Sequence, residues 1–238
     1  QMLLQPTIEK LYALNLKTMA AALTEDLSHL RPDISFEERI GLLVDREWEA
    51  RQQKRCAARL KAAKLRQPAC SEDIDYRAPR GLDRKVVQDI LSCRWIKAGR
   101  NVIITGPAGI GKSWLACAFA DQACRQGHTA LNQRVSRLAQ ELAVARADGS
   151  YIRYLERLAK VDLLILDDWG LGDLDKQSHV DLLEVIDDRC QKRATLVTSQ
   201  IPIAHWHDRI GSPTVADALL DRIVPKAVQL NLKGDSLR

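Results

Sequence analysis

Apolar side chains recur three or four residues apart in the first fifth of the chain, on a polar background. Over residues 7–30 this spacing predicts one amphipathic helix, which an Arg-Pro-Asp sequence at 31–33 interrupts. A second helix is predicted to begin at Ser35, whose side chain would form a reciprocal capping box with Glu38. The face of the second helix that we expect to be buried consists of Phe36, Ile40, Leu43, Val44 and Trp48.

From residue 102 onward the pattern changes to short, continuous apolar runs separated by stretches with helical spacing. The runs that predict strands lie at 102–104, 129–131, 161–170, 194–200 and 227–232. Such runs are typical of strands buried on both faces, and their alternation with helices predicts a mostly parallel sheet in an α/β domain. A segment with two prolines and an acidic cluster precedes this part and predicts a linker. The expected divisions are a helical domain at 1–66, a linker at 67–84 and the α/β domain at 85–238.

A glycine-rich turn, GPAGIGKS, follows the first predicted strand and precedes a predicted helix. The pattern G-x-x-x-x-G-K-[ST] in this context predicts a phosphate-binding loop, because its glycines allow backbone N–H groups to surround phosphate oxygens. We expect Lys112 to reach the β- and γ-phosphates of a nucleoside triphosphate and Ser113 to ligate Mg²⁺. A turn that binds nothing is the alternative, which the context disfavours. The residues expected to bind the nucleotide are Gly106, Pro107, Ala108, Gly109, Ile110, Gly111, Lys112, Ser113 and Trp114.

Two later strands end in polar residues, which a parallel sheet would bring to the same edge. The leucine-rich run ends in Asp167 and Asp168. We expect Asp167 to hold magnesium and Asp168 to orient or deprotonate the attacking water. The next run ends in Ser199 and Gln200, of which Gln200 is preferred as the side chain that senses the γ-phosphate. Turns that merely terminate strands are the alternative at both places.

An apolar helix predicted near the C-terminus carries Arg222 on its polar side. Within one subunit Arg222 could pair with Asp217 or Asp221. In an assembly it could instead reach the γ-phosphate of a neighbouring subunit and stabilise transition-state charge as an arginine finger. The sequence HWHD at 205–208 has the composition of a metal site but no third ligand at a helpful spacing, so we favour a packing or surface role.

The chain carries a formal net charge of +5, and basic side chains are concentrated in one segment. Residues 51–66 contain seven basic side chains and no acidic one, on alanine-rich sequence that favours a helix. Without acidic partners one turn away, these cations are available to phosphates, and each contact would release counterions from a DNA duplex. A solvated helix face is the alternative. The residues expected to contact DNA are Arg51, Lys54, Arg55, Arg59, Lys61 and Lys64.

The remaining composition favours a globular protein of the cytoplasm. Six cysteines are scattered without a C-x-x-C pair, which favours free thiols over a disulfide framework or a zinc site. The apolar runs are too short to span a bilayer, and the N-terminal sequence lacks the form of a signal peptide, so we expect no membrane partner.

With these motifs in hand, the chain resembles the AAA+ ATPases of the DnaC/DnaA clade, and within it the IstB-type ATP-binding proteins that accompany insertion-sequence transposases. The resemblance covers nearly the whole chain and is carried by FEERIGLLVDREW, PACSEDIDYRAPRGLD, NVIITGPAGIGKSWLACA, LLILDDWG, TLVTSQIP, HWHDRIG, ADALLDRIV and LKGDSLR. It implies an α/β AAA+ P-loop core with a five-stranded parallel sheet flanked by helices. A small all-α domain would precede this core, and the usual C-terminal helical lid would be missing.

The resemblance also implies a function. ATP and Mg²⁺ would be the cofactors, and ATP would promote a homo-oligomer in which Arg222 completes the site of a neighbour. The oligomer would bind double-stranded DNA with little sequence preference, deform it, and recruit and stimulate a transposase. Asp168 stands where many AAA+ enzymes have glutamate, which predicts slow hydrolysis, and Arg238 would act as a second sensor within its own subunit.

Two other functions are the alternatives. A helicase loader of the DnaC type would act on single-stranded DNA together with a replicative helicase. A small-molecule P-loop kinase comes from another class of proteins, and it gives no reason for the basic segment at 51–66.

Overall fold

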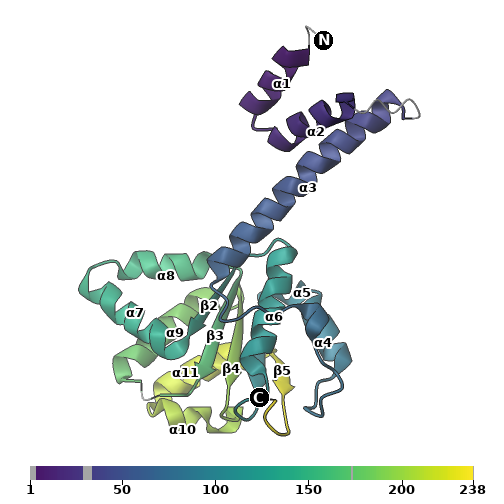
Figure 1. The fold of residues 1–238 in the computed structure, drawn as a ribbon. Coiled ribbons are helices and arrows are strands. Elements are labelled where there is room, and N and C mark those ends of the chain that lie inside the picture. Colours follow the sequence, from purple (N-terminus) through teal and green to yellow (C-terminus); the bar gives the residue numbers. More distant parts are fainter. Residues whose placement is uncertain (1–3, 29–33, 173, 238) are drawn as a thin grey trace. The chain divides into compact units, whose positions relative to one another are not determined.

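The computed structural model describes residues 4–28, 34–172 and 174–237 (Figure 1). By their contacts, the residues form two compact units, Gln1–Ala58 and Arg59–Arg238. The boundary between the units falls within the helix α3 (Phe36–Ala63). The domain limits expected from the sequence, at residues 66 and 84, stay a prediction.

The first unit is helical, but its first predicted helix is divided in two. Helices α1 (Leu4–Ala13) and α2 (Lys17–Ser28) are separated at Asn15, whose φ of 59° is left-handed. The N–H of Asn15 bonds to the Tyr12 carbonyl and the next N–H bonds to Leu11, the paired hydrogen bonds that end many helices. Asparagine tolerates this conformation better than most residues, and the apolar spacing of the sequence continues across the break without showing it.

Helix α3 begins with the predicted capping box. The N–H of Ser35 donates to the Glu38 carboxylate at 2.9 Å, and the N–H of Glu38 donates to the Ser35 hydroxyl at 3.2 Å. Together the two side chains satisfy backbone donors that the first turn of a helix leaves without partners.

The predicted buried face of α3 is wrong for four of its five residues. Only Leu43 is buried, whereas the exposed fraction is 73% for Phe36 and 61% for Trp48. The other two exposed members of this apolar stripe are Ile40 and Val44.

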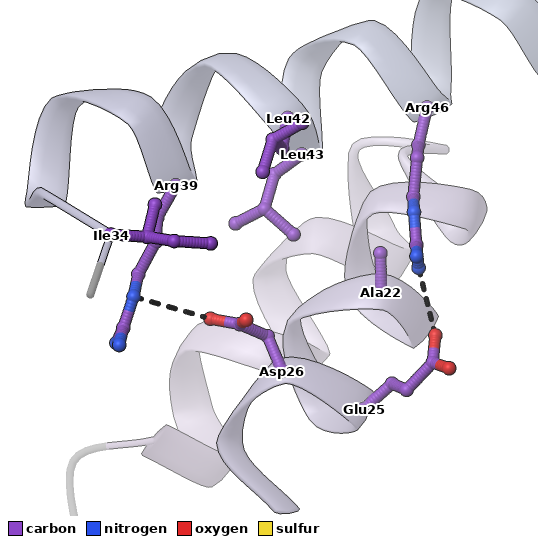
Figure 2. Close-up of a pocket in the computed structure, with 8 residues that line it drawn as sticks. All are labelled: Ala22, Glu25, Asp26, Ile34, Arg39, Leu42, Leu43 and Arg46. Atoms are coloured by element: carbon purple, nitrogen blue, oxygen red, sulfur yellow. Dashed lines mark hydrogen bonds and ion pairs between the residues drawn. The ribbon is translucent and has the colours of Figure 1, made fainter. Parts of the chain in front are cut away.

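The reason is that α2 covers a different side of α3. Figure 2 shows Asp26 and Glu25 of α2 pointing toward Arg39 and Arg46 of α3, with Leu43 among them. These residues border a small cavity of about 180 Å³ in the first unit. The carboxylate of Glu47, the neighbour of Trp48, accepts from the Met19 N–H at 3.0 Å, which turns Glu47 rather than the apolar stripe toward α2.

The second unit contains a five-stranded parallel sheet in the order β2-β3-β4-β1-β5, which confirms the predicted fold class (Figure 1). The strands are β1 (Val102–Thr105), β2 (Ala130–Arg134), β3 (Leu163–Trp169), β4 (Ala194–Ser199) and β5 (Val228–Asn231). The helices are α4 (Arg84–Leu91), α5 (Arg94–Lys97), α6 (Lys112–Arg125), α7 (Val135–Ala147), α8 (Tyr151–Lys160), α9 (Lys176–Arg189), α10 (Trp206–Ile210) and α11 (Pro213–Ile223), with short 3-10 turns at Ser71–Asp73 and Ile203–His205.

Successive residues of the central strands pack into two separate hydrophobic cores, one on each face of the sheet. Val102 and Ile104 of β1 pack with apolar side chains of α4, α5 and α6 on one face of the sheet, whereas Ile103 packs with those of α7, α8, α9, α10 and α11 on the other. All three side chains are fully buried. Side chains that alternate across a strand and are buried on both faces explain why the sequence shows a continuous apolar run.

Within the described part of the chain, no helix combines the length and apolar character needed to cross a membrane. The six cysteines are free thiols, three of them fully enclosed in the packing of the second unit.

A buried arginine donates hydrogen bonds to carbonyls at the ends of several elements. We therefore predict that its replacement lowers the stability of the fold. The guanidinium of Arg189 is 1% exposed and donates to the Leu158, Val161 and Ala194 carbonyls. Replacement by Met would leave at least two buried acceptors without donors, each costing ~1–3 kcal/mol. We therefore expect Arg189→Met to lower the free energy of unfolding in urea by roughly 3 kcal/mol or more.

The matched control is Arg94→Ala, because the side chain of Arg94 is 77% exposed and makes only a surface ion pair with Asp89. Such pairs contribute at most about 1 kcal/mol. Equal losses of stability in the two variants would contradict the structural role given to Arg189.

Candidate nucleotide-binding site

The phosphate loop joins β1 to α6 and takes a path that two of its glycines make possible. Gly106 and Gly109 have φ values of 152° and 79°. A Cβ atom on Gly106 would lie 2.7 Å from the Leu232 carbonyl oxygen, and one on Gly109 would lie 2.2 Å from the Ser236 hydroxyl. Since either contact is a clash, the loop needs glycine at both positions to lie against the C-terminal segment.

The ammonium of Lys112 lies inside the curve of the loop. It donates to the Gly106 and Pro107 carbonyls, both at 2.8 Å, and the side chain is 7% exposed. Burial lowers the pKa of Lys112, and the nearby carboxylates of Asp168 and Asp167 partly offset this effect. A cation enclosed in this way gains from an anionic ligand that enters the loop.

The structure brings Ser113 and Asp167 together beneath the loop. The Ser113 hydroxyl donates to Oδ1 of Asp167 at 2.7 Å, and the buried Thr198 hydroxyl donates to the same oxygen at 2.5 Å. Hydroxyl and carboxylate oxygens are the ligands that Mg²⁺ prefers. Because Ser113 and Asp167 already lie at contact distance and Asp167 is 1% exposed, this pair fits a magnesium ion.

Asp168 is held by an irregularity of β3. The register of β3 with β4 shifts between Leu166 and Trp169, and Asp168 has a left-handed φ of 63°. Its backbone N–H donates to the Thr198 hydroxyl at 3.1 Å. A bulge changes the direction of side chains relative to a regular strand. Here it allows the side chains of two consecutive residues, Asp167 and Asp168, to lie at the same edge of the sheet.

Two arginines that the site prediction omitted contact these acids. Nη1 of Arg66 lies 3.1 Å from Oδ2 of Asp167 and 3.4 Å from Oδ2 of Asp168. Nε of Arg134 lies 3.2 Å from the same oxygen of Asp168. The sequence shows both residues as basic but gives no sign of their partners, because each pairing joins segments far apart in the chain.

Of the two polar residues at the end of β4, Ser199 and Gln200, only Gln200 lines the cavity beside the loop. The cavity has a volume of about 510 Å³, and Gln200, Lys112, Ser113 and Asp168 all line it. The hydroxyl of Ser199 is buried instead, donating to the Trp169 carbonyl at 2.8 Å and accepting from the Ile201 N–H at 3.0 Å. Through these two bonds Ser199 fixes the backbone at the ends of β3 and β4.

The other wall of the cavity comes from the segment that the sequence predicts as a linker and from the C-terminal segment. Asp73, Asp75, Arg80 and Leu237 line it. The guanidinium of Arg80 is 3% exposed and donates to the Asp75 carbonyl at 3.0 Å and to the Ile110 carbonyl at 3.3 Å. Burial lowers the pKa of Arg80. Sequence reasoning missed this wall, because Pro, Gly and acidic residues look the same in a linker and in an ordered wall.

Arg222 does not line the cavity of its own chain. Its Nε pairs with the Asp187 carboxylate, and its Nη1 donates to the Ala218 carbonyl at 2.9 Å. The partner is thus Asp187 on α9, rather than Asp217 or Asp221 as the sequence suggested. Arg238 lies outside the described residues.

Within the HWHD sequence the tryptophan packs in the core, whereas the other residues lie at or near the surface. Trp206 is buried and its ring lies 5.4 Å from that of Trp169, while His207 pairs with Asp217 at 3.3 Å. Across residues 4–28, 34–172 and 174–237, no group of three or more His, Cys, Asp or Glu side chains is placed to hold a metal.

The residues expected to contact DNA differ in their surroundings. Nε of Arg59 donates to the Cys124 carbonyl on α6 at 2.8 Å, and Arg51 pairs with Glu47 at 2.7 Å. The other four residues are exposed to solvent: Lys54, Arg55, Lys61 and Lys64.

Comparisons with known proteins are consistent with this geometry. The family model described as "IstB-like ATP binding protein" matches residues 9–238. The insertion sequence ATP-binding protein y4pL of Sinorhizobium fredii is 49% identical over 238 residues, covering 100% of this chain and 97% of the relative. The IS1162 ATP-binding protein of Pseudomonas fluorescens is 48% identical over 206 residues, covering 84% of this chain and 88% of the relative.

A solved structure shares the fold at low identity. The crystal structure of the DnaC helicase loader superposes with a TM-score of 0.55 and 18% identity, over 74% of this chain and 99% of that chain. At this identity the likeness concerns the AAA+ fold.

The position of Lys112 leads to a prediction for nucleotide binding. Lys112→Ala removes the cation that the loop encloses, and each charge-assisted hydrogen bond contributes about 1.5–3 kcal/mol. We expect the affinity for ATP, measured by titration calorimetry, to fall roughly 10- to 100-fold. Lys97→Ala, which removes an exposed lysine of α5, should leave the affinity unchanged. Equal affinities in the two variants would contradict the site.

Proposed function

The chain belongs to the family of IstB-like ATP binding proteins, and we propose from this that it is a DNA-dependent ATPase of insertion-sequence transposition. In this proposal ATP promotes assembly of the protein on double-stranded DNA with little sequence preference. The assembly then recruits and stimulates the transposase. The observation that carries the proposal is the cluster of Ser113, Asp167 and Thr198 beneath the loop, with Asp168 beside it.

In the proposed ATPase, different residues bind the phosphates, hold the metal and position the attacking water. The loop amides and Lys112 bind the phosphates, and Ser113 with Asp167 would hold Mg²⁺, which neutralises developing phosphate charge. Asp168 orients the attacking water and accepts its proton. Gln200 lines the same cavity and is the candidate for contact with the γ-phosphate. The short side chain of Asp168, already paired with arginine, is consistent with slow hydrolysis.

DNA binding is supported by the exposed basic residues of α3, which are Lys54, Arg55 and Lys61, and by Lys64 directly after the helix. These side chains are available to backbone phosphates. Contacts of this kind carry no sequence information, which is consistent with binding that is largely independent of sequence.

Assembly is supported by two observations, each within one unit. Arg222 lies away from the nucleotide cavity of its own chain, so the proposed arginine-finger role requires a second subunit. In the first unit, the apolar stripe of α3 (Phe36, Ile40, Val44 and Trp48) is exposed, and contiguous exposed apolar side chains of this kind mark surfaces that contact other proteins. Another subunit or the transposase could cover the stripe.

A helicase loader acting on single-stranded DNA is the second candidate. The likeness to the solved DnaC helicase loader favours it, although at 18% identity this likeness shows the fold alone. The two functions differ in the DNA that they require, which makes them separable in one experiment.

Light scattering tests the proposed function directly. We expect the purified protein to form a large complex only with ATP and duplex DNA together, and to remain small with ADP or without nucleotide. Arg222→Ala should bind ATP normally but lose on the order of 1,000-fold in DNA-dependent hydrolysis, the scale of known arginine fingers. Arg209→Ala, which removes an exposed arginine of α10, is the control.

A monomer under every condition would overturn the shared-site mechanism. A complex that forms on single-stranded but not duplex DNA would replace the transposition role by the helicase-loader role.

The basic part of α3 gives a second prediction. Reversal of Lys54, Arg55 and Lys61 to Glu should weaken duplex binding and reduce the slope of log affinity against log salt by roughly 0.9 for each lost phosphate contact. Arg59 is left intact because its guanidinium anchors the helix to Cys124.

The matched control reverses Arg94, Lys97 and Arg100, three exposed cations on and after α5. Affinity and salt slope would be measured by fluorescence anisotropy. If both triple variants behaved alike, the contact surface would lie elsewhere on the protein.

A further inference from the structure

The guanidinium of Arg66 bridges the two acids at the end of β3. Arg66 lies three residues beyond the end of α3, and its Nη1 contacts Asp167 at 3.1 Å and Asp168 at 3.4 Å. We propose that Arg66 is a γ-phosphate-recognition residue that exchanges these carboxylates for the terminal phosphate when ATP enters with its metal. The proposal rests on the proposed ATPase function, to which it adds a residue that distinguishes ATP from ADP.

The hydrogen bonds of Asp167 support the exchange. Its Oδ1 already accepts from the hydroxyls of Ser113 and Thr198, so Arg66 occupies the other oxygen, Oδ2. A divalent cation held by Ser113 and Asp167 would lie next to the guanidinium, and two cations that share one carboxylate repel each other. We therefore expect the Arg66 guanidinium to move away from Asp167 when the metal and the nucleotide are bound.

The terminal phosphate of a bound nucleotide would be an anion within the cavity that Arg66 lines. Arg66 lines the same cavity as Lys112, Ser113 and Gln200, the residues expected at the β- and γ-phosphates. In this structure Nη1 alone contacts one oxygen of each carboxylate. A phosphate would allow the planar guanidinium to donate two parallel hydrogen bonds to two oxygens of one group. ADP lacks the γ-phosphate and would leave Arg66 on the acids.

The main chain beside Arg66 packs against α6, so we expect the exchange to need only a change of rotamer. Burial raises the pKa of the Cys117 thiol in the second turn of α6, and the nearby main chain of Gln67 and Arg66 partly offsets this effect. Leu65 packs against the core beside α6. The side chain of Arg66, in contrast, is 45% exposed and has room to move.

Arg134 supplies an internal comparison. Its Nε contacts Asp168 at 3.2 Å, and it borders a neighbouring cavity rather than the one that contains Lys112. Arg134 can thus keep Asp168 paired after Arg66 has moved. Both arginines are about half-exposed and both touch Asp168, so a variant of each removes one charge from nearly the same place.

The experiment measures the affinities of fluorescent mant-ATP and mant-ADP for the full chain in saturating Mg²⁺. In Mg²⁺ we expect Arg66→Ala to weaken mant-ATP about 10- to 100-fold, the loss of one or two charge-assisted hydrogen bonds, and mant-ADP no more than about twofold. Arg66→Lys should recover part of the loss, because it retains the charge without the fork. Arg134→Ala should leave the ratio of the two affinities unchanged.

A second readout concerns the metal rather than the nucleotide. Because Arg66 competes for Asp167, Arg66→Ala should lower the Mg²⁺ concentration that gives half-maximal mant-ADP binding, and Arg94→Ala should not. Thermal unfolding of each variant confirms that it is folded, and Arg66→Lys stands in if the alanine variant is not.

Equal losses for the two nucleotides, or no change in either, would overturn the proposal and leave Arg66 as a surface ion pair. A failure of the proposed function would give a different result from a failure of the Arg66 proposal. A wild-type protein that binds ATP in preference to ADP through Arg66 but never assembles on DNA would overturn the transposition role and leave the assignment of Arg66 intact. Absence of any ATP binding by the wild-type protein would overturn both.

Discussion

The structure of the nucleotide site depends on one buried anion. The carboxylate of Asp167 is 1% exposed and sits at the end of β3, where it accepts from Thr198 of β4 and from Ser113 of α6. A buried carboxylate is costly unless it is hydrogen-bonded or paired, so these contacts fix β3, β4 and the start of α6 with respect to one another. The place of the phosphate loop, which leads into Ser113, follows from that constraint.

Distant parts of the chain complete the site around this centre. The loop glycines lie against Leu232 and Ser236 near the C-terminus, while Arg80, from the segment before α4, donates to the carbonyl of Ile110 inside the loop. The loop is thus enclosed by two segments that are far apart in sequence. This enclosure explains why glycine is required where a longer side chain would meet backbone, and why the supposed linker is ordered at the cavity wall.

The sequence predicts what depends on local pattern and misses what depends on pairing across the fold. Buried strands and the loop were predictable, because continuous apolar runs and glycine spacing are local signals. The same spacing predicted an apolar face on α3 but could not show that α2 covers the side with Leu43 and leaves Trp48 exposed. Thr198 and Arg134 reach the acids through the register of β4 and β2 with β3, and Arg66 reaches them from the segment after α3. No local signal in the sequence records these pairings.

The second unit offers a physical route by which DNA and nucleotide could influence each other. Arg59, at the start of this unit, bonds to the Cys124 carbonyl of α6, and Leu65, the neighbour of Arg66, packs against Cys117 and Ala118 of the same helix. The exposed cation Lys61 lies between these two anchors, and α6 begins at Lys112 in the phosphate loop. If phosphate contacts at Lys61 favour one position of the Arg66 side chain, linkage requires that ATP raise the affinity for DNA by the same factor by which DNA raises the affinity for ATP. An effect of DNA on ATP affinity without the reverse effect is therefore thermodynamically excluded at equilibrium for a single assembly state.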